Sequence, residues 1–291
     1  MDIVRKRKSI LLAAVIYSLI AAVLTLVLGL KSGIEFSSGS MLTLKFENPV
    51  EQSELKLTLS ELGYGEAIVQ RTGGGDFIIR VHELTSEVKT NLEGILQEKF
   101  GKLTEVEFNS VSPMIATETA RNAAIAVAVA SVGILLYIAW AFRKMPRPFI
   151  CGVSAIIALI HDSLVSVAFF AVMGRFLSWE INLMFITGVL AVIGYSVNNT
   201  VVVFDRIREN LTLGTGINFG TTVNNSLLET FGRCLNTTIT TLIAVLAILI
   251  FVGAVIRNFA VVLLVGLVAG TFSSSFIAPL LLVTWEKGKQ S

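Results

Sequence analysis

Six long apolar stretches divide this 291-residue chain, and they constrain its fold more than any other feature. A transmembrane helix needs about 20 apolar residues to cross the hydrocarbon core of a bilayer. The stretches that reach this length are residues 9–30, 122–142, 149–174, 181–204, 234–256 and 259–285. The whole chain is only 15% charged, whereas soluble domains average about 25%. The sequence therefore predicts a polytopic α-helical membrane protein with six transmembrane helices.

The first apolar stretch follows a basic N-terminus, residues 5–8. A basic start is also typical of a signal peptide, but the apolar part of a signal peptide is usually about 7–15 residues long. Residues 9–30 exceed that length, and no small-residue cleavage pattern follows them. We interpret residues 1–30 as a cytoplasmic N-terminus and an uncleaved first transmembrane helix.

Lysine and arginine are unevenly divided between the two sets of loops. The N-terminus, residues 143–147, the segment 205–232 with Arg233, and the C-terminal tail would share one side of the membrane and hold most of these cations. The two short loops on the opposite side carry only Arg175 and Arg257. Cytoplasmic loops are enriched in Lys and Arg, so both termini are expected in the cytoplasm of a cell-membrane protein. The five-helix domain 118–291 then contains the cytoplasmic segment 205–232 and the tail.

Residues 31–117 are charged and mixed in character, and this topology places them outside the cytoplasm. Alternation predicts strands at residues 41–46 and 103–108, and residues 67–71 and 77–81 are predicted strands because they flank a glycine-rich turn. Helical spacing predicts helices at 49–62 and 85–100. The order β-α-β-β-α-β indicates a small ferredoxin-like α+β domain. The glycine-rich residues 72–76 have some likeness to a phosphate loop, but no Lys-Ser/Thr pair and no helix start follow. We interpret them as a hairpin turn.

Asp162 lies near the middle of the third apolar stretch, where a charged group is expensive. A lone carboxylate at that depth favours its protonated, neutral form, which is the property that a proton carrier needs. The alternative is a structural Asp that hydrogen-bonds a neighbouring helix and never changes charge. His161 precedes it and points about 100° away on a helix, so the two residues need not share a partner.

Two further polar sites lie in or beside the later stretches. Asn198, Asn199 and Thr200 interrupt the fourth stretch, where amides can hold helices together or orient a water but cannot carry protons. Arg233 lies at the edge of the fifth stretch, where it would be an ordinary cytoplasmic anchor. If that helix begins earlier, near Asn224, Arg233 enters the membrane interior and needs an anionic partner.

A charge cluster follows the fourth stretch, and it consists of Asp205, Arg206, Arg208 and Glu209. Local salt bridges at a helix end are one interpretation, and such surface pairs contribute less than about 1 kcal/mol each. A docking face for a partner is the other. The sequence alone leaves both open.

The chain carries none of the motifs that would indicate an enzyme or a cofactor site. It has no His-Glu-x-x-His, Gly-x-Ser-x-Gly or Walker pattern, and its two histidines, His82 and His161, exclude a multi-histidine metal site within the chain. Cys151 and Cys234 lack further ligands at metal spacing and are interpreted as buried or inert thiols. No basic run with interleaved aromatics indicates nucleic-acid binding. Energy for any transport must come from an ion gradient or a partner.

Several motifs together resemble the SecF family, whose members pair with SecD beside the Sec protein-conducting channel. The resemblance covers nearly the whole chain. The matching segments are GIEFSSGS (33–40), ALIHD (158–162), EINL (180–183), VIGYSVNNTVVVFDRIREN (192–210) and RCLNTTITT (233–241). It implies a half-transporter of the resistance-nodulation-division type, in which proton flow helps to pull exported polypeptides outward. A SecD-like partner, a SecYEG-type channel, exported polypeptides at the external domain and membrane lipid are the implied partners.

The resemblance also implies two functional residues, of which one carries over. The family has an Arg at the start of the fifth span, and this corresponds to Arg233. It has an Asp in a Ser-x-Asn-Asp-Thr motif, where this chain has Asn199, which cannot titrate. Either the relay runs through Asp162 and carboxylates of the partner, or coupling is altered; sodium in place of protons stays open. A small-molecule or lipid exporter and a non-transporting scaffold are the competing functions.

Overall fold

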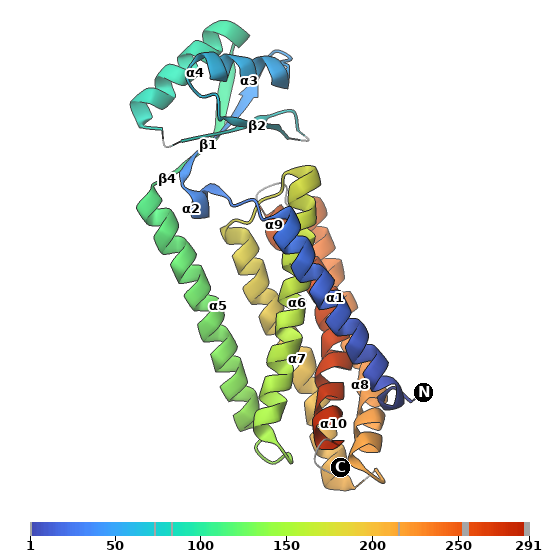
Figure 1. Ribbon diagram of the computed structural model, residues 1–291. Coiled ribbons are helices and arrows are strands. Elements are labelled where there is room, and N and C mark those ends of the chain that lie inside the picture. The colour runs from blue at the N-terminus through green and yellow to red at the C-terminus, as the bar shows by residue number, and fades with distance from the viewer. Residues whose placement is uncertain (1, 73, 83, 215, 252–255, 288–291) are drawn as a thin grey trace. The chain divides into compact units, whose positions relative to one another are not determined.

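The computed structural model describes residues 2–72, 74–82, 84–214, 216–251 and 256–287. It contains two compact units: a helical unit, Met1–Lys31 with Ala124–Ser291, and an α/β unit, Ser32–Ala123 (Figure 1). Six helices in the described ranges are long and apolar enough to cross a membrane, which confirms the predicted polytopic helical class. Gly73 of the predicted turn, residues 252–255 of the fifth stretch and the tail after Lys287 lie outside the described residues.

The α/β unit is built on a four-stranded antiparallel sheet with the strand order β2-β3-β1-β4. Its elements are α2 (Ile34–Ser37), β1 (Gly39–Phe46), α3 (Gln52–Glu61), β2 (Ile68–Arg71), β3 (Phe77–Val81), α4 (Ser86–Phe100) and β4 (Leu103–Val111). The strands and the two longer helices thus follow one another as β-α-β-β-α-β. The short helix α2 between Lys31 and β1 was not predicted.

One face of this sheet is covered by both longer helices (Figure 1). Alternate strand residues such as Leu42 and Ile79 point to that face and are fully buried. Leu59 of α3 and Leu96 of α4, also fully buried, belong to the same apolar cluster. The side-chain oxygen of Thr85 caps the start of α4 by accepting a hydrogen bond from the backbone N–H of Val88 (3.4 Å). Period-two strands and amphipathic helices together therefore form a single core in this unit.

The helical unit contains the long apolar helices. They are α1 (Arg7–Leu28, preceded by the short helix η1, Val4–Lys6), α5 (Pro113–Ala141, which begins in the α/β unit), α6 (Pro148–Leu177), α7 (Leu183–Leu213), α8 (Phe219–Phe251), α9 (Arg257–Phe272) and α10 (Ala278–Lys287). A π-helical segment, η2 (Ser273–Ile277), joins α9 to α10, so that the sixth candidate span runs without a break from Arg257 to Glu286. The π-helical segment was not predicted.

Three helices extend beyond the apolar stretches that predicted them. The segment 205–232 was expected to be cytoplasmic and separate from the spans, but α7 continues to Leu213 and α8 already begins at Phe219. Gly214 ends α7 in a left-handed conformation with φ 65°, as is common at helix C-termini. Likewise, α5 begins at Pro113, before the predicted span 122–142. Hydropathy marks where a helix is apolar, and it misses polar turns that continue the same helix.

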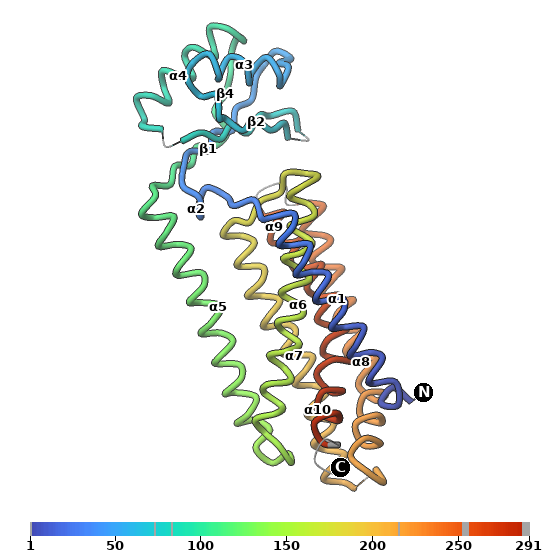
Figure 2. The backbone as a smooth tube through the Cα atoms, in the orientation of Figure 1, coloured from blue at the N-terminus to red at the C-terminus, as the bar shows by residue number. Residues whose placement is uncertain are grey.

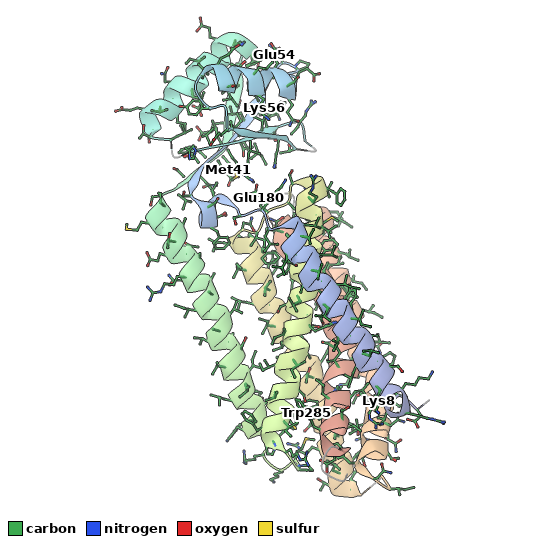
Figure 3. All side chains as sticks on the ribbon, in the orientation of Figure 1. Lys8, Met41, Glu54, Lys56, Glu180 and Trp285 are labelled. Carbon is green, nitrogen blue, oxygen red and sulfur yellow. The ribbon has the colours of Figure 1, made fainter. Side chains whose placement is uncertain are left out.

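Within the helical unit, α7 packs most closely against α9, and α1 runs alongside α6 (Figure 2). Lys8 and Trp285 lie at one end of this unit, whereas Glu180 lies at the opposite end (Figure 3). Arg147, at the start of α6, donates a hydrogen bond to the backbone oxygen of Trp285 (2.7 Å). The N-terminal helix, the 143–147 loop and the C-terminal helix therefore share one end of the unit.

Two glycines allow the close approach of α7 and α9. A Cβ added to Gly266 of α9 would overlap the side chain of Val192 on α7. A Cβ added to Gly188 of α7 would lie only 2.9 Å from the Cβ of Val262 on α9. Small residues at such crossings let helix backbones pack closely in membranes, where apolar burial between helices provides little drive.

We expect the substitution Gly266→Ala to separate α7 from α9 and to destabilise the protein by roughly 1–3 kcal/mol, as overpacking of a close contact does. Gly194→Ala on α7 is the matched control, because a Cβ there would meet no atom within 4 Å. Thermal unfolding in detergent should show a lower midpoint for Gly266→Ala only. Equal midpoints for the two variants would show that this contact is not tight.

Candidate functional site

Asp162 lies at the centre of a buried polar network in the helical unit, and its exposed fraction is 0%. Its Oδ2 atom accepts hydrogen bonds from Ser196 Oγ of α7 (2.7 Å) and from Ser273 Oγ of η2 (2.7 Å). Its Oδ1 atom lies 3.1 Å from Nδ1 of His161. The carboxyl group therefore connects three segments that are far apart in the sequence.

The side chains of Asp162 and His161 contact each other, which their positions on a helix did not require. Their Cβ atoms diverge along α6, yet both side chains turn toward each other and meet through Nδ1 and Oδ1. Asp162 is consequently not a lone carboxylate, and it has the helix-to-helix hydrogen bonds that a structural role requires. A change in the charge of Asp162 stays a prediction.

Local backbone features bring Ser196 and Ser273 within hydrogen-bonding distance of Asp162. The π-helical segment η2 begins at Ser273, and single π-turns inside α-helices are frequently found at functional sites. Gly270, one turn earlier, has no side chain, and a Cβ there would lie 3.1 Å from Ser196 Cβ and 3.5 Å from Asp162 Oδ2. A larger residue at this position would separate α9 from both polar groups.

Asn199 belongs to a second buried cluster, and its exposed fraction is 1%. Its amide nitrogen donates to Thr238 Oγ1 of α8 (3.5 Å), and that hydroxyl lies 2.7 Å from Thr271 Oγ1 of α9. The hydroxyl group of Tyr195 also reaches Thr238 (3.5 Å). Asn199 therefore holds α7 against α8 and α9, as the structural interpretation of this amide requires.

The neighbours of Asn199 have different surroundings. Thr200 is buried and donates within its own helix to the backbone oxygen of Ser196 (3.0 Å). Asn198, in contrast, is exposed on the surface of the helical unit. The three consecutive polar residues thus do not act together, since only Asn199 reaches another helix.

Arg233 lies inside α8, about 14 residues or roughly 21 Å of helix after Phe219. The helix begins even earlier than Asn224, so Arg233 does not lie at a helix start, and its role as an anchor or as a functional residue stays a prediction. Its side chain is exposed and forms no ion pair within the described part of the chain. Glu229, one turn earlier, is bound by Arg206 (2.6 Å) and by Asn210 (2.8 Å) instead.

The charge cluster at the end of α7 forms the local salt bridges that its sequence predicted. Arg208 pairs with Asp205 (2.5 Å), and Arg206 pairs with Glu209 (2.6 Å). Arg206 also reaches Glu229 and thereby joins α7 to α8. All five side chains stay partly exposed, so the alternative of a docking face stays a prediction.

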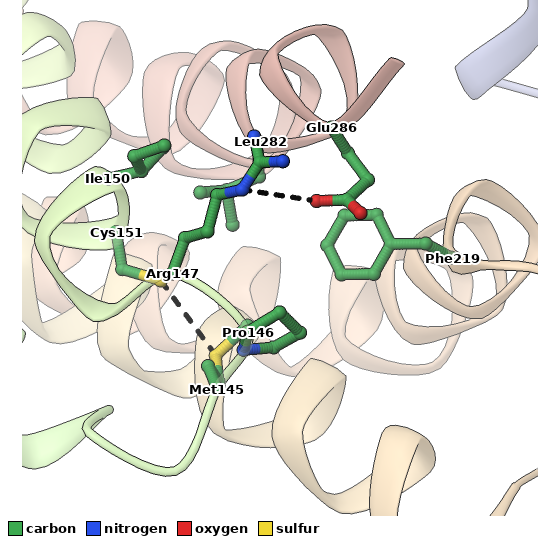
Figure 4. A pocket seen from close by; sticks show the side chains of 8 residues that line it. All are labelled: Met145, Pro146, Arg147, Ile150, Cys151, Phe219, Leu282 and Glu286. Carbon is green, nitrogen blue, oxygen red and sulfur yellow. Dashed lines mark hydrogen bonds and ion pairs between the residues drawn. The ribbon is translucent and has the colours of Figure 1, made fainter. Parts of the chain in front are cut away.

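A small pocket lies at the end of the helical unit that contains Trp285 (Figure 4). Its lining residues are Met145, Pro146, Arg147, Ile150, Cys151, Phe219, Leu282 and Glu286. Arg147 pairs with Glu286 across it (3.7 Å), and the free thiol of Cys151 lies 3.9 Å from Met145 Sδ. Cys234 is likewise buried and free. The arginine of this pocket is already bound to the last turn of α10.

Sequence reasoning missed several residues of these networks. Ser196, Tyr195 and Thr238 lie in the family-like motifs but had no assigned role, and Ser273 and Thr271 were not singled out. The run Ser273-Ser274-Ser275 in the last apolar stretch is the one signal that could have pointed to η2.

The comparisons with known proteins agree on one family. Residues 91–288 match the family described as protein export membrane protein SecD/SecF, C-terminal. The chain is 42% identical to the protein translocase subunit SecF of Thermobaculum terrenum over 98% of this chain and 94% of the relative. It is 38% identical to the SecF subunit of Anaerolinea thermophila over 90% of this chain and 87% of the relative.

Longer relatives contain this chain as one part. The crystal structure of SecDF from Thermus thermophilus, a translocon-associated membrane protein, matches 99% of this chain with a TM-score of 0.87 and 31% identity. The chain covers 39% of that structure. Sequence identity over nearly the full length and a common backbone lead to the same assignment: the chain belongs to the SecF family of protein translocase subunits.

Proposed function

We propose that this chain is an accessory subunit of the Sec protein translocase, which promotes protein export together with a SecD-like partner and the proton-motive force. The relatives that match it over almost their whole length are SecF translocase subunits. In SecDF of Thermus thermophilus and of Bacillus subtilis, the matching part is 38% of a longer chain. A separate SecD-like subunit is therefore the expected companion of this chain.

The proposed arrangement follows the distribution of charge. Both termini and the 143–147 loop, which share one end of the helical unit, would lie in the cytoplasm, beside a SecYEG-type channel. The α/β unit would be an extracytoplasmic domain that contacts exported polypeptides. Its strand order β2-β3-β1-β4 supports the ferredoxin-like topology. The helical unit would be half of a twelve-helix transporter of the resistance-nodulation-division type.

The proposal that a second subunit contacts the helical unit rests on Arg233. An arginine at the centre of a membrane helix costs about 2.5–3.5 kcal/mol on insertion scales, and such residues pair with one another or line functional pathways. Arg233 is exposed inside a candidate span and has no acidic partner in the described residues. Asn236, one turn later on α8, and Asn198 on α7 are exposed as well. These polar groups would face a second subunit that supplies a carboxylate.

Proton coupling in this half would depend on Asp162. Asn199 stands where the family has an Asp, and an amide has no titratable proton in the physiological range. Asp162 is the carboxylate that lies buried within a candidate span and contacts α7 and η2. A change in its charge would alter two helix contacts at once. It therefore suits a proton carrier that moves helices.

A site-specific cross-link tests the partner directly. A photo-reactive amino acid at Asn236 should join the chain to a SecD-like subunit in native membranes, because this surface of α8 faces the partner. The same group at Leu19, an exposed residue of α1, is the control and should react with lipid. Recovery of lipid adducts alone at Asn236, with no SecD-like protein copurifying, would contradict the proposal.

A further inference from the structure

The nitrogen of His161 that faces away from Asp162 is the unusual atom of the buried network. His161 is only 6% exposed, and its Nε2 has no hydrogen-bond partner among the described residues. Its ring lies beside Tyr17 of α1, with 6.0 Å between centroids, and beside Phe272 of α9, at 6.2 Å. Buried polar nitrogens are almost always partnered, so this one needs an explanation.

The contacts of Asp162 restrict where protons can reside. Both hydroxyl groups lie 2.7 Å from Oδ2, and each can donate its hydrogen to that oxygen. When both hydroxyl groups donate, Oδ2 holds no proton, and a proton on this carboxyl group sits on Oδ1, which faces Nδ1 of His161. The histidine ring is consequently the group through which Oδ1 gains or loses a proton.

The same contacts define two states of the pair. When Asp162 is ionised, a neutral ring with its proton on Nδ1 donates to Oδ1, and Nε2 presents only a lone pair. When the pair holds one proton more, Nε2 carries hydrogen, whether the extra proton belongs to the ring or to the carboxyl group. A buried N–H without an acceptor is unfavourable, so the loaded state forms only when water or another acceptor reaches Nε2.

We propose that His161 is the proton port of Asp162, that is, the group through which the carboxyl group exchanges protons with water. A proton donor at Nε2 gives up its proton to the ring, and the proton on Nδ1 passes to Oδ1 of Asp162. The carboxylate becomes a carboxylic acid, and the neutral ring changes from the Nδ1–H to the Nε2–H tautomer. Release reverses both transfers. The inference rests on the proposed role of Asp162 as a proton carrier, and it names the atom at which the carrier meets water.

The surroundings of the pair contain few competing groups. Among the described residues that contact the pair, α1 contributes the titratable Tyr17, α9 contributes Phe272, and α7 and η2 contribute the hydroxyls of Ser196 and Ser273. Neither His161 nor Asp162 forms another ion pair in the described ranges. Access to Nε2 is therefore set by how closely α1 and α9 cover the ring.

Nitrogen NMR of histidine in the full-length chain in lipid nanodiscs tests this. The chain has two histidines, so His82→Gln, on the exposed surface of the α/β unit, leaves His161 as the single signal. We expect an Nδ1–H ring at high pH that switches to an Nε2–H ring on acidification. With Asp162→Asn, we expect this switch to be lost.

Two results would overturn the proposal. The first is a His161 ring that already carries its proton on Nε2 at high pH. The second is a His161 ring that becomes doubly protonated on acidification both in the chain with Asp162 and in the Asp162→Asn variant. A switch as predicted, combined with normal export by Asp162→Asn, would instead refute only the coupling role of Asp162.

The rate of proton uptake in a variant of His161 distinguishes a proton port from a purely structural histidine. Asn at position 161 keeps an amide donor near the position of Nδ1 but has no atom equivalent to Nε2. His161→Asn should slow proton uptake by Asp162 on the order of 100-fold, the usual contribution of a positioned proton-transfer group, without a change in the melting midpoint. Unchanged uptake, or a loss explained wholly by a lower melting midpoint, would show that His161 is structural.

Discussion

Arg233→Ala is expected to reduce gradient-driven export at least about tenfold without loss of membrane insertion. The side chain is exposed in the interior of α8 and has no acidic partner in the described chain. If a carboxylate of the SecD-like subunit binds it, removal of the arginine leaves that carboxylate uncompensated, and breaking a buried ion pair in this way typically costs about 3–5 kcal/mol. Export of a reporter protein from inverted membrane vesicles measures the effect.

Two further variants show whether the charge of Arg233 is what matters. Arg233→Lys keeps the charge and should retain part of the activity, although lysine lacks the planar fork of arginine. Arg143→Ala removes a cation from the exposed loop before α6 and should export normally. If Arg233→Ala also exports like the wild type, the arginine is only an anchor of α8.

Asp162→Asn is expected to abolish proton-coupled export while the protein stays folded. The amide oxygen of Asn can accept the hydrogen bonds of Ser196 and Ser273, so the contacts among α6, α7 and η2 survive. What is lost is the proton-binding carboxyl group. Asp162→Leu should in addition destabilise the protein by roughly 1–3 kcal/mol for each buried polar group left without a partner.

Asn199→Asp is the reciprocal variant, because it restores the carboxylate that the family has at this position. It should preserve or strengthen export, as the Thr238 and Thr271 hydroxyl groups beside it can donate to a carboxylate. Loss of export in Asn199→Asp and retention in Asp162→Asn would together place the coupling outside both residues.

The helical class was predictable from the sequence because bilayer crossing requires long apolar runs, and these are visible without any structure. Helix ends were not, because α7 and α8 continue through charged turns whose side chains pair with one another, such as Arg206 with Glu229. This had a functional consequence. Arg233 looked like an anchor at a helix start, whereas the true start at Phe219 places it in the helix interior.

The candidate site was predictable only in part. Asp162 is conspicuous as a charge in an apolar stretch, but its partners Ser196 and Ser273 are small residues that lie 34 and 111 positions away in the sequence. Its contact with His161 was not predicted, because adjacent residues diverge by about 100° on a helix and only the side-chain torsions bring them together. The π-helical segment that places Ser273 has no periodicity of its own to recognise.

Proton flux through the reconstituted complex tests the central claim most directly. The chain and its SecD-like partner would be placed in liposomes with a pH gradient, and the internal pH would be followed with a trapped dye. We expect flux with the wild-type chain and loss of flux with Asp162→Asn, at equal amounts of folded protein. Undiminished flux through the Asp162→Asn complex would contradict the account, since the carboxyl group at the centre of the buried network would then carry no proton.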